Sequence, residues 1–404
     1  MRIAGIIAEY DPFHNGHAAH IANTRSENGG NATHVVCVIS GSFTQRGEPA
    51  LLSKFKRAEM ALSCGADLVL ELPLPWAMAP AEHFASGGVA VLNALGCVDL
   101  LSFGSECGDA TALKKLANLS THPIYVAALK QALENGVPYA VANQSAAEQV
   151  VGVNIANHLA SPNNTLGIEY LRAITVQNAN WEVYTMQRQG VQHGEKIAKD
   201  AFASATLLRE MTRDHNTSLL CAYMPEPSHA ILQTAMQAGE ITSHTHRLEN
   251  ALLAQLRRLK SNEFTNLPWL SEGLENRLYR ESRVAQDYTS LLNAVQTRRY
   301  PMARLRRVLW ASLLGLTAED THGLPPYIRV LGMNDRGREI LAAATPTLPI
   351  LTRSAQIANL NERAKRIFAL ECTATDLHAL TMAHPLPCGT DHTTKLIVKC
   401  KFPG

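Results

Sequence analysis

The sequence lacks long hydrophobic runs. No stretch of about 18 or more apolar residues, the length that a membrane-spanning helix requires, occurs in the chain. The apolar run at the N-terminus is short and ends in Glu9 and Asp11, which is unlike a secretory signal peptide. We therefore expect no membrane partner and a cytoplasmic location.

Cysteine clusters are also lacking. The eight cysteines are scattered without a CxxC pair, which excludes a zinc ribbon and argues against a disulfide framework in a chain of 404 residues. His244 and His246 have no third metal ligand near them in the sequence, so we expect surface histidines and no metal site built by the protein. No serine or cysteine stands in a nucleophile motif, so covalent catalysis is not indicated.

The chain has little excess charge of either sign. It carries 37 Lys and Arg against 35 Asp and Glu, for a formal net charge of +2. This balance does not by itself indicate nucleic acid; we expect no DNA partner, and any basic surface must be local. The hydrophobic fraction of 46% and the charged fraction of 18% are typical of a globular protein, and the length predicts two or three domains.

Continuous apolar runs alternate with helix-like segments in the N-terminal part of the chain. The runs that predict buried strands are Ile3–Ala8, His34–Ile39, Asp67–Leu72 and Val98–Phe103. Helices are expected from Gly16, over Ser53–Ser63 and over Pro80–Leu95. This alternation predicts an α/β fold with a Rossmann-like parallel sheet, covered on both faces, and ligands at the carboxyl ends of the strands. Those ends are Glu9–His17, Ser40–Glu48, Glu71–Pro73 and Phe103–Glu106.

Helical patterns dominate the rest of the chain. They cover residues 109–160 and the segments Glu249–Leu259, Leu274–Val295 and Arg304–Leu314. We also expect a strand at Trp181–Met186, a mixed region at Tyr327–Leu341 and an edge strand at Thr394–Lys399. Proline and polar residues at 216–230 predict a boundary between a sheet domain at 1–220 and a mainly helical C-terminal domain at 221–404.

The clearest chemical motif, DPFHNGH, runs from Asp11 to His17 directly after the first strand. Gly16 permits close approach of a ligand, and the start of the following helix offers unpaired N–H groups and a positive dipole end to phosphate. The imidazoles of His14 and His17 add donors that can follow charge as it builds on an α-phosphate. The motif therefore predicts a nucleotide site.

In this position the motif resembles the HxGH nucleotidyltransferase superfamily, whose Rossmann-like domains promote attack on a nucleotide α-phosphate with release of pyrophosphate. Members often have a second phosphate motif, and the segment SATLLR, from Ser204 to Arg209, is similar to it. Ser204 is a suitable N-cap for the helix expected there. The resemblance implies catalytic roles for His14, His17, Ser204, Thr206 and Arg209.

Longer segments resemble one particular family within this superfamily. GIIAEYDPFHNGHAAH, SGSFTQRGEPALLSKFKRAEMAL, GADLVLELP, FGSE and SPNNTLGIEY resemble the tRNA(Met) cytidine acetate ligase family, and RVLGMNDRGREIL does so more faintly. The family implies that acetate attacks the α-phosphate of ATP to give acetyl-adenylate, with Mg²⁺ bridging the phosphates. The acetyl group then passes to the wobble cytidine of elongator tRNA(Met), which forms N(4)-acetylcytidine.

The resemblance also implies a set of nucleotide-binding residues. They are Ile7, Ala8, Glu9, Tyr10, Asp11, Pro12, Phe13, His14, Asn15, Gly16, His17, His20, Gly104, Asn163 and Arg188. Asn164 competes with Asn163 for its role, and His20 could equally be a structural histidine. The family usually has Asn at the position of Asp11, and an extra carboxylate near triphosphate is unfavourable unless a cation or an Arg offsets it.

One C-terminal segment concentrates arginines around Tyr300. They are Arg298, Arg299, Arg304, Arg306 and Arg307. Arginines beside an aromatic ring suit phosphate contact and base stacking, but the pattern is also typical of the solvated face of an amphipathic helix. The resemblance favours tRNA. The segment Gln45–Pro49 and Lys54 could hold acetate, tRNA phosphate or a helix start, or could be merely solvated.

Two other functions are compatible with these motifs. The chain could be an HxGH ligase or adenylyltransferase that acts on a small carboxylate metabolite without tRNA, which leaves the arginine-rich segment unused. It could also be a non-catalytic RNA-binding protein with a degenerate nucleotide site. Asp11 favours that last hypothesis, whereas His14, Gly16 and His17 argue against it.

Overall fold

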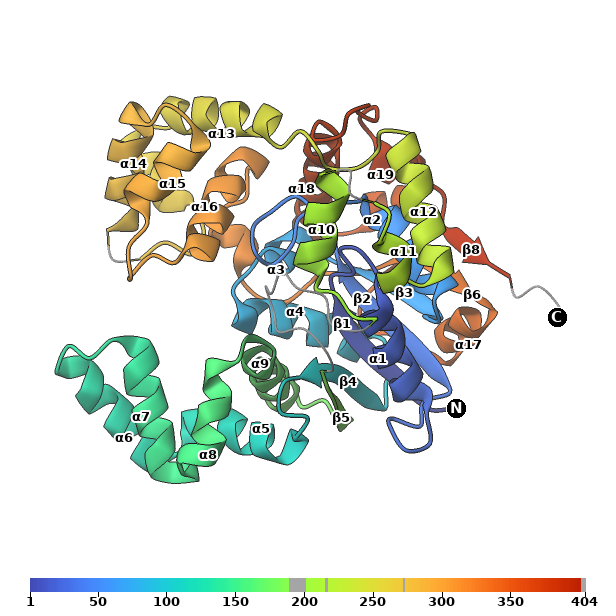
Figure 1. Ribbon diagram of the computed structural model, residues 1–404, viewed down its shortest axis with the longest axis horizontal. Coiled ribbons are helices and arrows are strands. Elements are labelled where there is room, and N and C mark those ends of the chain that lie inside the picture. The colour runs from blue at the N-terminus through green and yellow to red at the C-terminus, as the bar shows by residue number, and fades with distance from the viewer. Residues whose placement is uncertain (189–200, 215–216, 272, 401–404) are drawn as a thin grey trace.

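A mixed sheet of eight strands forms the centre of the computed structural model, which describes residues 1–188, 201–214, 217–271 and 273–400 (Figure 1). The first five strands are β1 (Ile3–Ala8), β2 (His34–Ser40), β3 (Leu68–Leu72), β4 (Leu100–Ser105) and β5 (Glu182–Gln187). They are parallel and stand in the order β5-β4-β1-β2-β3. The predicted Rossmann-like parallel sheet is therefore confirmed, and the direction of its winding reverses between β1 and β4.

Helices cover both faces of this sheet because its strands are apolar on both sides. In β2, Val36 and Val38 pack in the same cluster as residues of α4, whereas Val35, Cys37 and Ile39 pack with residues of α2. The helices of the N-terminal part are α1 (Asn15–Arg25), α2 (Lys54–Ser63), α3 (Leu74–Ala77), α4 (Ala81–Ala94), α5 (Ala110–Ala117), α6 (Pro123–Glu134), α7 (Tyr139–Val151), α8 (Val153–Ala156), α9 (Pro162–Val176) and α10 (Ala205–Arg213).

The C-terminal half is mainly helical, as expected. Its helices are α11 (Leu220–Tyr223), α12 (Glu226–Gln237), α13 (His246–Arg258), α14 (Leu274–Val284), α15 (Tyr288–Val295), α16 (Met302–Leu314), α17 (Asp335–Ala343), α18 (Glu362–Ala379) and α19 (Thr390–Thr393). The single helix predicted over Leu274–Val295 is wrong, because Asp287 caps a new helix there and accepts a hydrogen bond from the backbone N–H of Ser290 at 2.6 Å.

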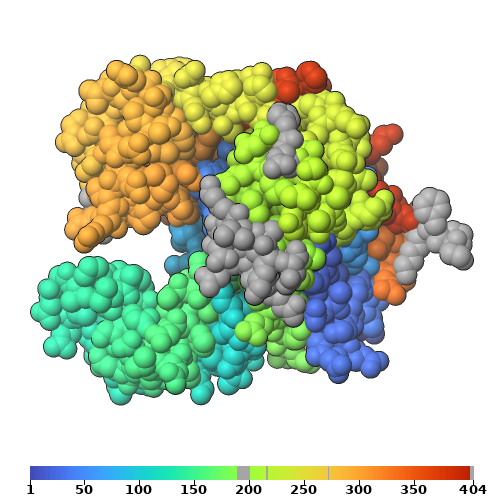
Figure 2. All heavy atoms as spheres, in the orientation of Figure 1, coloured from blue at the N-terminus to red at the C-terminus, as the bar shows by residue number. Residues whose placement is uncertain are grey.

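Three C-terminal strands return to the sheet. They are β6 (Ile328–Asn334), β7 (Ile350–Leu351) and β8 (Ile397–Lys399). β6 pairs antiparallel with β3 and carries β7 and β8 as parallel neighbours, so the expected edge strand near the C-terminus is confirmed. The sheet thus includes strands from both sides of residue 220, where the sequence predicts a domain boundary. That boundary stays a prediction. In Figure 2, α6–α8 and α13–α16 form two lobes that stand apart on one side of the molecule.

A buried ion cluster attaches β6 and the C-terminal helices to the parallel sheet. Lys54, at the start of α2, is 0% exposed, and its Nζ lies 2.5 Å from Glu71 of β3 and 2.7 Å from Asp391 of α19. Arg329 of β6 lies 2.9 Å from Glu71 and 2.5 Å from Asp391. Two cations and two carboxylates therefore balance each other in the interior, and the alternative that Lys54 is a solvated surface charge is wrong.

A third carboxyl group, that of Glu371 in α18, completes the cluster. It accepts a hydrogen bond from the backbone N–H of Leu74, and Lys54 Nζ lies 3.5 Å from it. Burial and the neighbouring Glu71 raise the pKa of Glu371 well above its ordinary value, which favours the neutral acid. Burial would lower the pKa of Lys54, but Asp391 and Glu71 outweigh it and raise that pKa instead. The lysine therefore stays charged inside the protein.

Replacing Lys54 with Ala should lower the free energy of unfolding by about 3–5 kcal/mol, because Glu71 and Asp391 would stay buried with one cation fewer. Urea unfolding followed by circular dichroism measures the change. Lys130→Ala is the matched control: its side chain is 75% exposed, so it should cost less than about 0.5 kcal/mol. Equal urea midpoints for the two variants would show that the cluster adds no stability.

Candidate functional site

The loop between β1 and α1 uses two histidines to cap the helix. His14 is the N-cap residue of α1, and its Nδ1 accepts a hydrogen bond from Gly16 N at 3.0 Å. His17 Nδ1 accepts one from His14 N at 3.2 Å, so the two imidazoles form a reciprocal capping box. The rings stack with their centroids 3.7 Å apart. The loop backbone therefore fixes the orientation of both rings.

This capping assigns the protons of both imidazoles. Because each Nδ1 accepts a backbone N–H, a neutral ring must carry its proton on Nε2. Burial, with help from the charges of Arg188 and Arg209, lowers the pKa of His14 to about 3. Burial and the neighbouring His14 lower the pKa of His17 well below its ordinary value. The pair therefore offers two neutral Nε2–H donors that need not lose a proton to act.

His20 differs from this pair. Its Nε2 lies 2.9 Å from Ser102 Oγ, and Ser102 Oγ lies 2.7 Å from Thr24 Oγ1. Because Thr24 gives its own proton to the carbonyl of His20, Ser102 donates to Thr24 and accepts from His20. Burial lowers the pKa of His20 to about 4, so the ring is neutral and its one N–H is already used. This chain of hydrogen bonds favours the structural alternative for His20.

Arg209 from α10 reaches back to the same loop. Its Nη1 donates to the backbone carbonyl of Asp11 at 2.8 Å and lies 3.5 Å from the carboxylate of Asp11. Its Nη2 donates to Thr206 Oγ1 at 3.1 Å, and Ser204 caps α10 by accepting from Leu207 N, as predicted. Asp11 is 3% exposed and also accepts from Leu51 N at 2.7 Å. The unusual carboxylate is therefore offset by an arginine.

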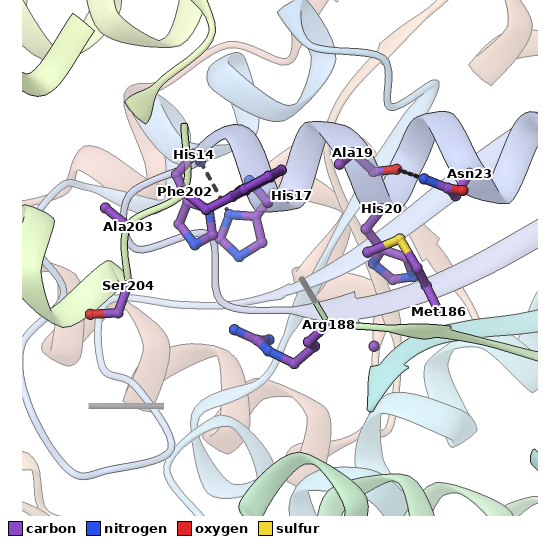
Figure 3. A pocket seen from close by; sticks show the side chains of 12 residues that line it. His14, His17, Ala19, His20, Asn23, Met186, Arg188, Phe202, Ala203 and Ser204 are labelled. Carbon is purple, nitrogen blue, oxygen red and sulfur yellow. Dashed lines mark hydrogen bonds between the residues drawn. The ribbon is translucent and has the colours of Figure 1, made fainter. Parts of the chain in front are cut away.

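A pocket opens between these two motifs at the reversal point of the sheet (Figure 3). The predicted residues that line it are His14, Gly16, His17, His20, Gly104, Arg188 and Ser204. Figure 3 shows both stacked histidine rings between Phe202 and Arg188. The structure thus brings the β1–α1 loop, the end of β4, the end of β5 and the start of α10 to one cavity.

Several predicted nucleotide-binding residues lie behind this pocket. Ile7, Tyr10 and Phe13 point into the cores, with 7%, 1% and 0% of their surfaces exposed. Asn15 donates to the carbonyls of Ala201 and Ala222, both at 3.0 Å, and so ties the loop to the flanks of α10. These side chains anchor the loop and do not line the pocket. Their predicted contact with nucleotide stays a prediction.

Asn163 and Asn164 belong to an interlocked turn. The carboxylate of Glu106 accepts from the backbone N–H groups of both residues, at 3.1 and 2.8 Å, and so caps α9 from another segment. Asn164, 1% exposed, accepts from the backbone of Glu106 and Cys107, whereas Asn163 is partly exposed. Asn164 is therefore committed to structure. Asn163 is engaged as well, because its Nδ2 donates to Glu106 Oε1 at 2.7 Å, but its partial exposure makes it the better candidate for a ligand of the two.

The loops after β2 and β3 do not line this pocket, which differs from the expectation for Ser40–Glu48 and Glu71–Pro73. Glu71 serves the ion cluster instead. The loop after β2 is held by Arg57, which is 0% exposed and donates to the carbonyls of Gly41 and, at 2.7 Å, Glu9. Arg57 thus fixes the loops after β1 and β2 relative to each other.

Three of the arginines predicted to bind RNA contact the protein itself. Arg304 donates to the carbonyl of Trp269, Arg306 pairs with Glu48, and Arg307 donates to the carbonyl of Gln45. Arg298 and Arg299 are exposed. Tyr300 is 6% exposed, so the expected stacking of a base on its ring is wrong. The role of the five arginines in RNA binding stays a prediction.

The described residues contain no group of three or more His, Cys, Asp and Glu side chains suited to a metal ion. A magnesium ion that bridges phosphate oxygens needs no such group, because the nucleotide supplies most of its ligands. The rings of His244 and His246 lie at the surface, tilted by 50° with their centroids 5.6 Å apart. None of the described helices has the length and hydrophobicity that a bilayer crossing requires.

Sequence reasoning missed two larger side chains of the pocket, Met186 and Phe202. Met186 ends a predicted strand and Phe202 lies two residues before the second motif, so both positions were close to recognised signals. Neither residue type has a chemical signature of its own. Only the tertiary arrangement brings them to the wall of the pocket.

Comparison with known proteins agrees with this geometry. A family model described as HIGH nucleotidyl transferase matches residues 1–390. A tRNA(Met) cytidine acetate ligase of Acetivibrio thermocellus is 35% identical over 98% of this chain and 100% of its own length. A protein of that name from Thermoanaerobacter sp. strain X514 is 36% identical, with the same two coverages.

Two solved structures have the same fold. The apo crystal structure of Thermotoga maritima TmcAL aligns with a TM-score of 0.93 and 28% identity, covering 99% of this chain and 100% of that one. The crystal structure of the same protein bound with alpha-thio ATP aligns with a TM-score of 0.91 and 29% identity at the same coverages. The likeness therefore extends across both sides of residue 220.

Replacing Asp11 with Asn should tighten ATP binding by about fivefold, on the order of 1 kcal/mol, because it removes a negative charge beside Arg209. Asparagine keeps an oxygen that can accept from Leu51 N. Isothermal titration calorimetry measures the affinity, and Asp335→Asn, an exposed position on α17, is the control. Weaker binding by the Asp11 variant would mean that the carboxylate is needed to orient Arg209.

Proposed function

The chain belongs to the tRNA(Met) cytidine acetate ligase family, within the HIGH nucleotidyltransferases, and on that premise we propose how its own residues ligate acetate to tRNA. Acetate attacks the α-phosphate of ATP, which forms acetyl-adenylate and releases pyrophosphate. The exocyclic amine of the wobble cytidine in elongator tRNA(Met) then attacks the acetyl carbonyl. AMP leaves, the amine loses a proton, and N(4)-acetylcytidine results.

One observation carries the first step: the stacked pair of neutral imidazoles, His14 and His17, whose Nε2–H groups have no hydrogen-bond partner among the described residues. Negative charge grows on the α-phosphate as acetate adds to it, and fixed donors stabilise that charge without reorganising. The N-terminus of α1 adds its dipole on the same side. We therefore assign His14 and His17 to the α-phosphate.

The remaining phosphates are assigned to the start of α10. Ser204, Thr206 and Arg209 lie on this helix, and Arg209 has the planar donor set that suits phosphate oxygens. Arg188 lines the opposite wall, near the end of β5. We propose that a Mg²⁺ ion bound with ATP would neutralise phosphate charge that the arginines do not reach, with the nucleotide supplying most of its ligands.

The C-terminal residues 221–404 are proposed to bind tRNA, in the cytoplasm where the tRNA is found. Arg298 and Arg299 are exposed and lie at the turn before α16. Acetate needs only a small cavity beside the α-phosphate. Its carboxylate is too poor an electrophile for an amine to attack until it becomes a mixed anhydride with AMP as the leaving group. The same site can therefore hold the activated acetyl group until the cytidine arrives.

Pyrophosphate release from ATP by the purified protein tests the proposed reaction. Release should require acetate, and radiolabelled acetyl should enter one tRNA when total tRNA is added. Release that ignores acetate, or acetate-dependent release without any acetylated tRNA, would contradict the assigned substrates. The second result would favour a ligase for a small carboxylate metabolite.

Replacing His17 with Ala should slow acetyl-adenylate formation by on the order of a hundredfold, because the transition state loses a fixed donor. ATP–pyrophosphate exchange in the presence of acetate measures this step. His20→Ala is the matched control from the same helix face, and it should change the rate by less than about tenfold because its N–H is held by Ser102. If the exchange rate of the His17 variant stays within a few fold of the wild-type rate, the α-phosphate does not bind at His17.

A further inference from the structure

A second hollow lies where α10, α13, α15 and α16 meet the loop after β2. The residues of its wall that matter here are Arg213, Glu249, Tyr288, Asn293, Arg306 and Trp310. None of them takes part in the chemistry described above. In Figure 1, α10 lies in front of the sheet, and the lobe that contains α13–α16 stands beside it.

The inner wall of this hollow is aromatic and its rim is polar. Trp310 is 2% exposed, and its ring lies 6.0 Å from that of the partly exposed Tyr288 at an interplanar angle of 52°. The exposed amide of Asn293 and the ion pair between Arg306 and Glu48 stand at the edge. An aromatic face beside hydrogen-bonding groups of both kinds matches a nucleobase, whose faces are apolar and whose edges both donate and accept.

The helix α10 connects this hollow directly to the nucleotide pocket. Ser204, the N-cap residue of α10, lines the pocket, and the last residue of the helix, Arg213, lines the hollow. Nine residues at 1.5 Å per residue place the two ends about 12 Å apart. This is a distance that a short run of extended nucleotides can bridge.

A line of cations marks the route between the two cavities. Arg209 and Arg213 are four residues apart, so they are neighbours on one face of α10. Arg213 is exposed and forms no ion pair with another residue of the described segments. Arg306 lies across the hollow, where it pairs with Glu48, so Arg213 is the cation of this wall that has no ion-pair partner among the described residues. Successive arginines suit the phosphodiester backbone of a single strand better than the lone charge of a small metabolite.

We infer that this hollow binds a nucleotide of the anticodon loop that neighbours the wobble cytidine, while that cytidine occupies the site at His14 and His17. The inference rests on the proposed function. The base of the neighbouring nucleotide stacks on Tyr288 and meets Asn293 at its edge. Its phosphates follow Arg213 and Arg306. The hollow thereby holds the loop with the cytidine amine at the activated acetyl group.

Replacing Arg213 with Ala tests the phosphate contact. The dissociation constant for tRNA should rise about fivefold to tenfold, and the slope of its logarithm against the logarithm of salt concentration should fall by about one. ATP–pyrophosphate exchange with acetate should stay unchanged, because Arg213 lies outside the nucleotide pocket. Arg338→Ala, 55% exposed on α17 at the other side of the molecule, is the matched control.

A double-mutant cycle tests the base contact. The probe is an anticodon stem-loop RNA in which the nucleotide on either side of the wobble cytidine is made abasic. One of the two abasic changes should weaken binding to the wild type by about tenfold, the usual effect of losing one stacked base. The same change should cost almost nothing with Tyr288→Ala, because that variant has already lost the partner ring. With Tyr288→Phe, which keeps an aromatic ring, the abasic change should again weaken binding by about tenfold.

Each outcome has a separate meaning. The hollow is not an RNA site if Arg213→Ala binds tRNA with the affinity and salt slope of the Arg338→Ala control. The same conclusion follows if the abasic change weakens binding equally in the wild type and in Tyr288→Ala. Neither result would contradict the proposed acetate ligase reaction. A wild-type protein that exchanges pyrophosphate but binds no tRNA would overturn both proposals. Binding of the stem-loop is measured without acetate or ATP, so it does not depend on turnover.

Discussion

The ion cluster around Lys54 is the constraint on which the rest of the fold depends. One lysine and one arginine, both buried, face Glu71 and Asp391, and these groups come from α2, β3, β6 and α19. Removing any one charge would leave its partners unpaired in a medium that solvates them poorly. The cluster therefore couples the antiparallel strand β6 to the parallel sheet and fixes the position of α2.

Fixing α2 also sets the nucleotide loop. Arg57, one turn after Lys54, donates to the carbonyl of Glu9, two residues before the DPFHNGH motif. That loop then uses its own backbone N–H groups to hold both imidazole rings. The ion cluster thus positions α2, Arg57 of α2 positions the loop, and the loop orients the two Nε2–H groups that face the pocket. The catalytic donors are oriented before any substrate is present.

The sequence predicts best what depends on local pattern. The first four parallel strands follow from continuous apolar runs, and the cap at Ser204 follows from a polar residue at a helix start. The antiparallel pairing of β6 with β3 does not, because Arg329 interrupts the apolar run of β6 and is buried only through partners far away in the sequence. The burial of Lys54 could not be predicted either, because its carboxylate partners are also distant in sequence and its position beside Ser53 is typical of a surface residue.

The candidate site shows the same division. His14, Gly16 and His17 are recognisable because their spacing is local, and the family resemblance supplies Arg209. The proton on each Nε2, the use of the His20 N–H by Ser102, and the capping of α9 by Glu106 depend on contacts between segments. No reading of spacing could have separated Asn163 from Asn164, since only the tertiary structure shows which amide is buried.

The position of Asp391 has a consequence for how the protein is made. Lys54 and Glu71 leave the ribosome more than 300 residues before Asp391 does (391 − 71 = 320). Until then the nascent sheet contains a lysine that lacks one of its two nearest carboxylates, and β3 lacks its antiparallel neighbour for most of that time. The parallel sheet is translated first, yet its interior reaches electrical balance only after Asp391 has been added.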